Sequence, residues 1–184
     1  MKMNNTFLVD VNNLHWKTPI NEPPWENNCL DNPYDLCLHG DVTVSIGNEV
    51  LKEELALNAS SLYLLRTLTK DHVIDIENPD PIMPCCGHSL NAIELMEDVL
   101  IVGCPNGLDF SIEHKDNKVR ITTESRKSIL ILFEEYKQVV YRFADEVKLA
   151  YEKSLPKIIE DKYDRAGYEL FWKEWNRRRT KIHQ

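Results

Sequence analysis

Alternation of apolar and polar residues indicates β-strands in two parts of the chain. Between residues 36 and 46 apolar residues alternate with polar ones, and Gly47-Asn48 ends the run. Residues 97–132 show the same period of two, interrupted by turn residues at 105–107 and 115–118. A period of two places alternate side chains on opposite faces of a strand. We therefore expect a mostly antiparallel β-meander sheet over 97–132, with one buried and one solvent-facing side.

Helical periodicity marks three other segments. Apolar residues three or four apart predict a helix over about 134–154, which Pro156 follows, and a second over about 161–179 with a wide aromatic face. A shorter helix is expected over about 59–70, with Asn58 as its N-cap. The fold class is therefore α+β, with helices packed on one face of the antiparallel sheet.

The two periodicities meet in consecutive segments, and this predicts the main hydrophobic core. One apolar face of the meander should pack on one apolar face of the helix over 134–154. The strand residues expected to be buried are Leu108, Phe110, Ile112, Val119 and Ile121, and their helical partners are Phe133, Val140, Phe143 and Val147.

Residues 1–34 have a different character from the rest. They contain eight asparagines and four prolines, but also Trp16 and Trp25, which a disordered tail rarely carries. We expect an irregular segment docked on the core, with at most a short strand near Thr6–Val11. A chain of 184 residues suits a single domain over 1–184.

The cysteines indicate a reduced environment. Five cysteines, an odd number at wide spacing, do not form the pattern of a disulfide framework. No apolar stretch is long enough for a signal peptide or a membrane span. The sequence predicts a cytoplasmic protein without disulfides and without membrane contact.

Charge is distributed unevenly. The net charge is −8, yet residues 173–184 carry five basic residues and one acidic residue, so the remaining 172 residues carry −12. A body this acidic repels nucleic acid and anionic membranes and attracts cationic partners. The same acidity also keeps a protein soluble, and this is the alternative explanation.

Cysteine and histidine form the sharpest candidate constellation. Cys37 and His39 lie two apart on a predicted strand, and Cys86 and His88 flank a glycine. Thiolate and imidazole are the ligands that zinc prefers, but the usual Cys-x-x-Cys spacing is missing. Buried neutral cysteines are the favoured interpretation, so we expect no metal and no cofactor. A nucleophilic Cys86 activated by His88 is a further alternative.

Two other clusters have a functional and a structural interpretation. Four carboxylates surround His72 and could bind a cation, although a solvated loop is favoured; they are Asp71, Asp75, Glu77 and Asp80. On the last helix, aromatic residues lie beside arginines in a combination common at protein interfaces. Its candidate partner-binding residues are Trp172, Trp175, Arg177 and Arg178, and the alternative is a helix packed on the sheet with a solvated end.

No motif of the common enzyme classes occurs in the sequence: it has no nucleophile elbow, no phosphate-binding glycine loop and no dinucleotide fingerprint. We therefore expect a small acidic cytoplasmic module that binds or inhibits a basic protein partner. In size and charge alone, the chain is similar to small acidic inhibitors of basic toxins such as nucleases. The alternatives are a Cys/His-based metal-binding protein or enzyme, and a structural or oligomeric protein without a ligand.

Overall fold

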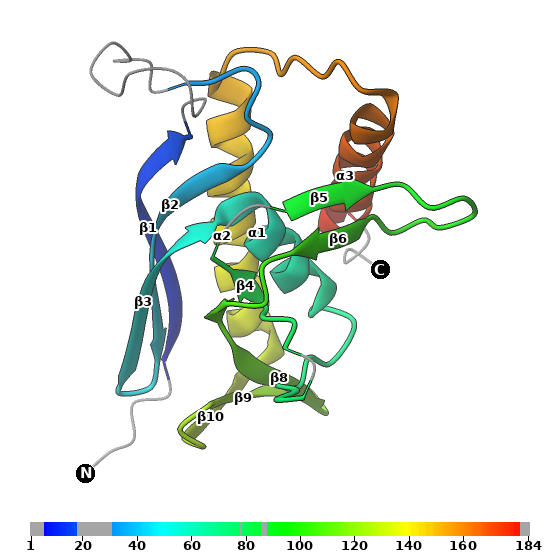
Figure 1. Cartoon of the computed structure of the whole chain (residues 1–184). Coiled ribbons are helices and arrows are strands. Elements are labelled where there is room, and N and C mark those ends of the chain that lie inside the picture. Colours follow the sequence, from blue (N-terminus) through cyan, green and yellow to red (C-terminus); the bar gives the residue numbers. More distant parts are fainter. Residues whose placement is uncertain (1–5, 18–30, 78, 86–87, 181–184) are drawn as a thin grey trace.

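Antiparallel pairing connects every strand that the structure describes, and three helices pack against the strands (Figure 1). The computed structural model describes residues 6–17, 31–77, 79–85 and 88–180. The elements are β1 (Phe7–Trp16), β2 (Leu38–Ile46), β3 (Glu49–Ala56), α1 (Leu57–Arg66), β4 (Met83–Pro84), β5 (His88–Asn91), β6 (Leu100–Gly103), β7 (Gly107–Leu108), β8 (Phe110–Lys115), β9 (Lys118–Thr123), β10 (Ser128–Leu132), α2 (Phe133–Lys153) and α3 (Lys162–Thr180). The predicted α+β class with two C-terminal helices is confirmed.

Strands β1, β2 and β3 form a three-stranded sheet in that order. Val9 lies opposite Val44 across the β1–β2 pair, and both side chains are buried. β1 is longer than the strand predicted near residues 6–11, and its register shifts between Asn12 and His15. Asn13, inside this irregularity, has a φ of 52°, a left-handed conformation that asparagine tolerates. The pairing therefore continues through a bulge to Trp16.

β3 is a strand that the hydrophobic pattern did not reveal. Gly47, with a φ of 63°, turns the chain from β2 into β3. Only Leu55 and Ala56 at the end of β3 are buried, and acidic residues occupy much of its length. Because β3 is an edge strand, one side of it faces solvent and tolerates these charges.

The strands between residues 97 and 132 do not form one continuous meander. β8, β9 and β10 form a three-stranded sheet as expected, but β6 pairs with β5 and β7 pairs with β4. For residues 71–89 the prolines and glycine of the sequence predict loop with short extended pieces, and β4 and the start of β5 lie within that stretch. Gly107 permits this pairing, because a Cβ atom there would lie 2.2 Å from the carbonyl oxygen of Met83.

The pairs β4–β7 and β5–β6 share one register and form a single long hairpin over residues 83–108. Pro84 lies opposite Gly107, and His88 lies opposite Gly103, so both pairs follow the same register. The hairpin extends away from the body in Figure 1, and α3 packs against its strand β5. A Cβ atom on Gly167 would lie 1.8 Å from the carbonyl oxygen of Leu90, so α3 and β5 pack backbone to backbone.

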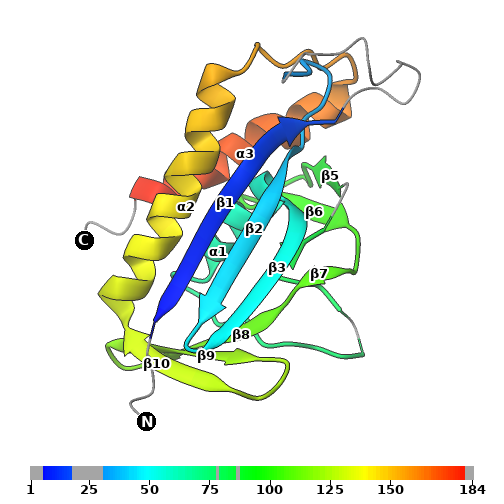
Figure 2. The same ribbon diagram turned by 90° about the vertical axis from the view of Figure 1, so that its left-hand side faces the viewer.

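Helix α2 lies along β1 and contacts the second sheet at its start (Figure 2). The ring of Phe7 packs 6.0 Å from that of Phe110 and 5.5 Å from that of Tyr136, which connects both sheets to α2. Most of the predicted core residues are buried, namely Phe110, Ile112, Val119, Ile121, Val140, Phe143 and Val147. Leu108 and Phe133 are only half-buried and pack at the edge of this core.

Helix α1 begins earlier and ends earlier than predicted. It runs from Leu57 to Arg66 rather than over 59–70, and Ala56 occupies the N-cap position that was assigned to Asn58. Asn58 is buried inside the first turn, and its side-chain amide donates to the carbonyl oxygen of Leu36 at 3.5 Å. The helix starts directly from the buried end of β3, so strand packing sets its first residue instead of a side-chain cap.

Replacing Phe143 with alanine tests the assignment of the buried face of α2. Phe143 is 1% exposed, so Phe143→Ala should lower the free energy of unfolding by about 3–5 kcal/mol in a urea titration. Leu149, on the same helix but 46% exposed, is the matched control, and Leu149→Ala should cost less than about 1 kcal/mol. Similar losses for both variants would contradict the assigned face.

Candidate functional site

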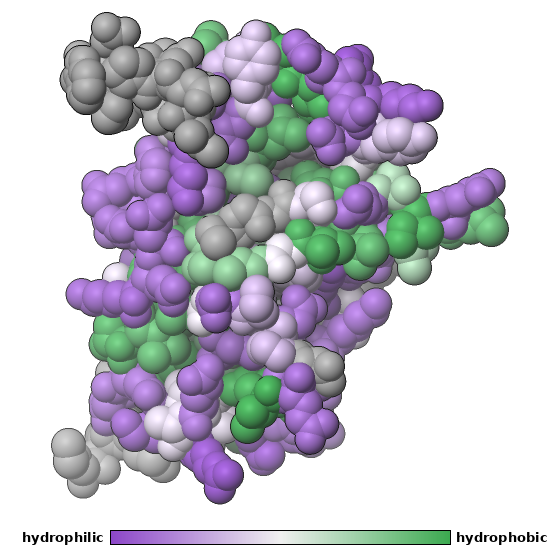
Figure 3. All heavy atoms as spheres, in the orientation of Figure 1, coloured by the Kyte–Doolittle hydropathy of each residue, from purple (hydrophilic) through white to green (hydrophobic). Residues whose placement is uncertain are grey.

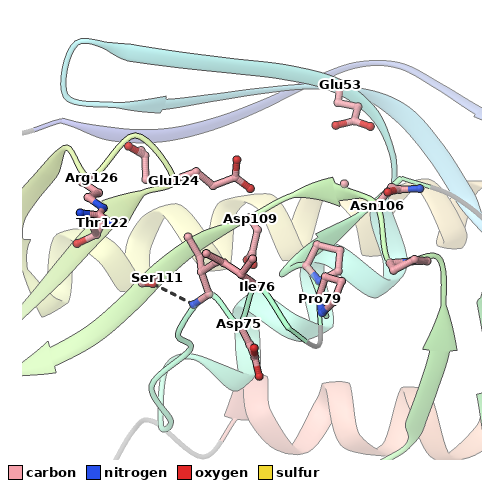
Figure 4. A pocket seen from close by; sticks show the side chains of 15 residues that line it. Glu53, Asp75, Ile76, Pro79, Asn106, Asp109, Ser111, Thr122, Glu124 and Arg126 are labelled. Carbon is pink, nitrogen blue, oxygen red and sulfur yellow. Dashed lines mark hydrogen bonds between the residues drawn. The ribbon is translucent and has the colours of Figure 1, made fainter.

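A cleft of about 750 Å³ lies between the edge strand β3 and the sheet formed by β8, β9 and β10 (Figure 4). Its other walls are the loop after α1, around residues 74–81, and the base of the long hairpin at 105–107. Four segments distant in sequence therefore contribute to one cavity. Ile74, Ile76 and three prolines supply its apolar surface, while the polar surface includes four carboxylates and one arginine.

Two carboxylates enter this cleft from opposite walls. Glu53 points in from β3, and Glu124 points in from the turn that follows β9 (Figure 4). Neither carboxylate has a hydrogen bond or an ion pair with any residue that the structure describes. Among the described lining residues Arg126 is the sole cation, and its side chain lies beside Thr122 at one end of the cleft. The cleft therefore keeps uncompensated negative charge.

Other carboxylates in the same region have structural roles. Asp109 accepts hydrogen bonds through one oxygen from His72 Nε2 at 2.7 Å and from the backbone amides of Ile82 and Phe110. These bonds attach the loop after α1 to β8. Asp109 lines the cleft, but its role is to shape the wall.

Glu49 is held in a similar way at an adjoining smaller cavity. It accepts hydrogen bonds from Thr123 at 2.8 Å and from Ser125 at 2.9 Å. The hydrogen bond from Thr123, followed by that from Ser125 and the charge of Lys127, lowers the pKa of Glu49 despite its partial burial. Glu49 therefore favours its ionised form and ties β3 to the end of β9 beside the cleft.

The acidic loop around His72 is organised by specific pairs. His72 contacts Asp109, and Asp71 accepts hydrogen bonds from both the backbone amide and the ring Nδ1 of His114. The bond from the backbone amide of His114, then that from its ring, lowers the pKa of Asp71. Asp75 belongs to the cleft lining. Within the described residues, these carboxylates do not gather around one point as a cation site.

The four candidate zinc ligands are only partly described. Cys37 precedes β2 and His39 is 2% exposed at the start of β2, whereas His88 begins β5 in a different sheet. Cys86 and the side chain of His88 lie outside the described part of the structure. Over the residues that the structure does describe, no three histidine, cysteine or acidic side chains are arranged to hold a metal ion.

The candidate partner-binding residues of α3 are largely enclosed. Trp175 is fully buried, and Trp172 packs edge-on against Tyr151 with ring centroids 5.0 Å apart. Arg178 donates to Glu174 at 2.6 Å and to Asp98 at 2.8 Å, while Arg177 donates to Glu97 at 3.0 Å. The aromatic and basic cluster thus packs α3 against the hairpin and the core.

Glu174 lies at the centre of this ion-pair network and is fully buried. Its carboxylate accepts two parallel bonds from the guanidinium of Arg66 at 2.8 Å, one from Arg178 and one from the backbone amide of Val99 at 2.8 Å. Arg66 belongs to α1, Arg178 to α3, and Val99 precedes β6. One carboxylate therefore connects two helices and the hairpin.

The tip of the hairpin presents apolar side chains to solvent, visible on the right of Figure 3. Its exposed apolar residues are Ile93, Leu95, Met96, Leu100 and Val102. Leu95 is completely exposed and has a φ of 68°, a conformation that is costly for leucine. Contiguous exposed apolar surface and backbone strain are both typical of interaction sites.

Comparisons with known proteins identify no relatives. No family model, curated protein or solved structure matches the chain. Over its described residues, none of the helices has both the length and the apolar character needed to cross a lipid bilayer. Function must therefore be inferred from the geometry and charge of the chain itself.

Glu53 and Glu124 were not identified from the sequence. They are separated by about 70 residues, and the chain has 30 acidic residues, so nothing local distinguishes them. Recognition of β3 as a strand was the missing step, because it places Glu53 at an open sheet edge.

Replacing Glu174 with glutamine should destabilise the fold strongly. Glu174→Gln leaves Arg66 and Arg178 without their buried counter-charge, and we expect a loss of about 3–5 kcal/mol in denaturant unfolding. Glu169→Gln, an exposed position on the same helix, should change stability by less than about 0.5 kcal/mol. A loss below about 1 kcal/mol for Glu174→Gln would contradict the proposed importance of the network.

The buried His39 should make stability depend on pH. Burial, then the positive charges of Lys17 and His15, lowers the pKa of His39 to about 4, while Glu54 opposes the shift. In the unfolded chain this histidine binds a proton near pH 6.5. The contribution of neutral His39 to the free energy of unfolding is therefore complete above pH 6.5 and is lost as the pH falls towards 4. The loss is about 3 kcal/mol. Urea titrations from pH 7.5 to 4 should show a shallower decline for His39→Gln, and parallel curves would contradict the assignment.

Proposed function

We propose that this chain is an acidic protein-binding module whose cleft receives a cationic side chain of a basic protein partner. The observation that carries the proposal is the pair of carboxylates, Glu53 and Glu124, that face each other across the cleft without a counter-ion among the described residues. Two like charges that share a partly enclosed space repel each other, and a cation placed between them removes this repulsion.

The shape and lining of the cleft suit lysine or arginine better than a free metal ion. Ile74 and Pro79 provide apolar surface for the methylene stem of a long basic side chain. An arginine guanidinium presents planar pairs of donors that match carboxylates. About 750 Å³ exceeds the needs of one side chain, so neighbouring residues of the partner would also enter.

The overall charge supports a protein partner of opposite sign. Outside residues 173–184 the net charge is −12, and in the fold the arginines at the end of α3 are paired with acidic side chains. The resulting negative potential accelerates the approach of a basic partner and repels nucleic acid. The apolar hairpin tip adds the other kind of surface that protein interfaces use. Inhibition of a basic enzyme would follow if the bound side chain were one that the enzyme requires.

Binding of a labelled hexa-arginine peptide, followed by fluorescence anisotropy, tests the cleft directly. The double variant Glu53→Gln/Glu124→Gln should weaken binding about tenfold, which corresponds to roughly 1.4 kcal/mol. The double variant Glu160→Gln/Glu169→Gln removes the same net charge at exposed positions outside the cleft and should change the affinity less than about twofold. Affinity should also fall between 0.1 M and 0.5 M salt, because the Debye length shortens from about 10 Å to about 4 Å.

Equal weakening by the two double variants would mean that the peptide senses only net charge, and the proposal would then be wrong. The proposal would also be wrong if the unaltered chain showed no measurable binding of the peptide at low salt. Thermal melts of all variants ensure that any loss of binding is not a loss of folding.

A further inference from the structure

Two cysteines meet at the base of the long hairpin. Cys85 directly follows β4, and Cys104 lies between β6 and β7. Their sulfur atoms are 3.4 Å apart, and both side chains are half-buried, so small reagents in solvent can reach them. A disulfide bond is about 2.05 Å long, so the two sulfurs need to approach by only about 1.4 Å.

The backbone of the hairpin holds this pair in position. The amide of Cys85 donates to the carbonyl oxygen of Asn106 at 2.9 Å, which extends the β4–β7 ladder past Pro84. Gly107 allows the strand of Cys104 to approach the strand of Cys85 closely. The short distance between the two sulfur atoms thus results from the pairing of the strands. This backbone pairing persists when the cysteine side chains rotate.

We propose that Cys85 and Cys104 form a reversible intramolecular disulfide that closes the base of the hairpin, with a small disulfide such as oxidised glutathione as the oxidant. The odd number and spacing of the cysteines argue against a structural disulfide framework. A reversible pair is a different case, because disulfides in reducing compartments are usually transient or redox-sensing.

The reaction is a double thiol–disulfide exchange. The Cys104 thiolate attacks one sulfur of oxidised glutathione and releases one glutathione thiolate, which leaves a mixed disulfide on the protein. The Cys85 thiolate then attacks the Cys104 sulfur and releases the second glutathione thiolate. The two protein thiols lose two protons and two electrons, and one glutathione disulfide becomes two glutathione thiols. We assign the first attack to Cys104 because the side-chain amide of Asn106 donates to its sulfur at 3.6 Å.

The disulfide would close a loop of the twenty residues from 85 to 104, which includes the apolar hairpin tip. Closing such a loop removes conformational freedom from the unfolded chain. For a chain of this size the expected result is a rise in Tm of roughly 5–10 °C in the oxidised form.

The full-length chain, equilibrated in oxidised and reduced glutathione, provides the test. After unfolding with an alkylating reagent present and intact-mass measurement, the oxidised chain should show three alkylated cysteines in place of five, and peptide mapping should connect Cys85 to Cys104. Cys104→Ser should abolish both this disulfide and the rise in Tm. The matched variants Cys86→Ser and Cys37→Ser should retain both.

Persistence of an intramolecular disulfide in Cys104→Ser would overturn the proposal and assign the reaction to another pair. Formation of glutathione adducts alone, or of dimers linked between chains, would also overturn it. Each outcome is independent of peptide binding in the cleft, so failure here and failure of the proposed function are distinguishable.

Discussion

The carboxylate of Glu174 has no contact with water, and a charge in that state is tolerated only while its cationic partners remain in place. Arg66 and Arg178 supply those partners from two helices, and the amide of Val99 adds a donor from the hairpin. The hairpin in turn provides one wall of the acidic cleft through residues 105–107. The arrangement of the candidate site thus depends on a buried ion-pair network that is not part of it.

The sequence predicted those helices and strands whose own pattern of apolar and polar residues determines their conformation. Helices α2 and α3 and strands β8–β10 have long, regular patterns; the two helices lie within one residue of their expected bounds, and the three strands form the expected antiparallel sheet. β3 was missed because its exposed edge permits glutamates where a buried strand would require apolar residues. Prolines and glycine predicted loop with short extended pieces over residues 71–89, but they did not reveal the partners of β4 and β5, because those partners are set by pairing with residues 100–108.

The candidate site was less accessible to prediction, for a related reason. Trp175 and Arg178 are notable in the sequence because their residue types are common at interfaces. In the structure, however, Arg178 already donates hydrogen bonds to Glu174, one helical turn away, and to Asp98, which is distant in sequence. Glu53 and Glu124 are ordinary in sequence and become notable only because neither carboxylate forms an ion pair with a described residue, although Arg126 lines the same cleft. The lack of an ion-pair partner among the described residues is a property of the fold, and the order of residues along the chain does not record it.

The contact between Phe7 and Tyr136 joins the first strand to a helix near the end of the chain. Synthesis at about 5–20 residues per second therefore leaves roughly 6–25 s between the two residues. During that interval β1, β2 and β3 can already pair, while the apolar side that α2 will cover remains open. Until α2 is synthesised, the nascent chain therefore exposes an apolar sheet surface that can aggregate. The speed of translation, or a chaperone that covers this surface, then affects the yield of folded protein.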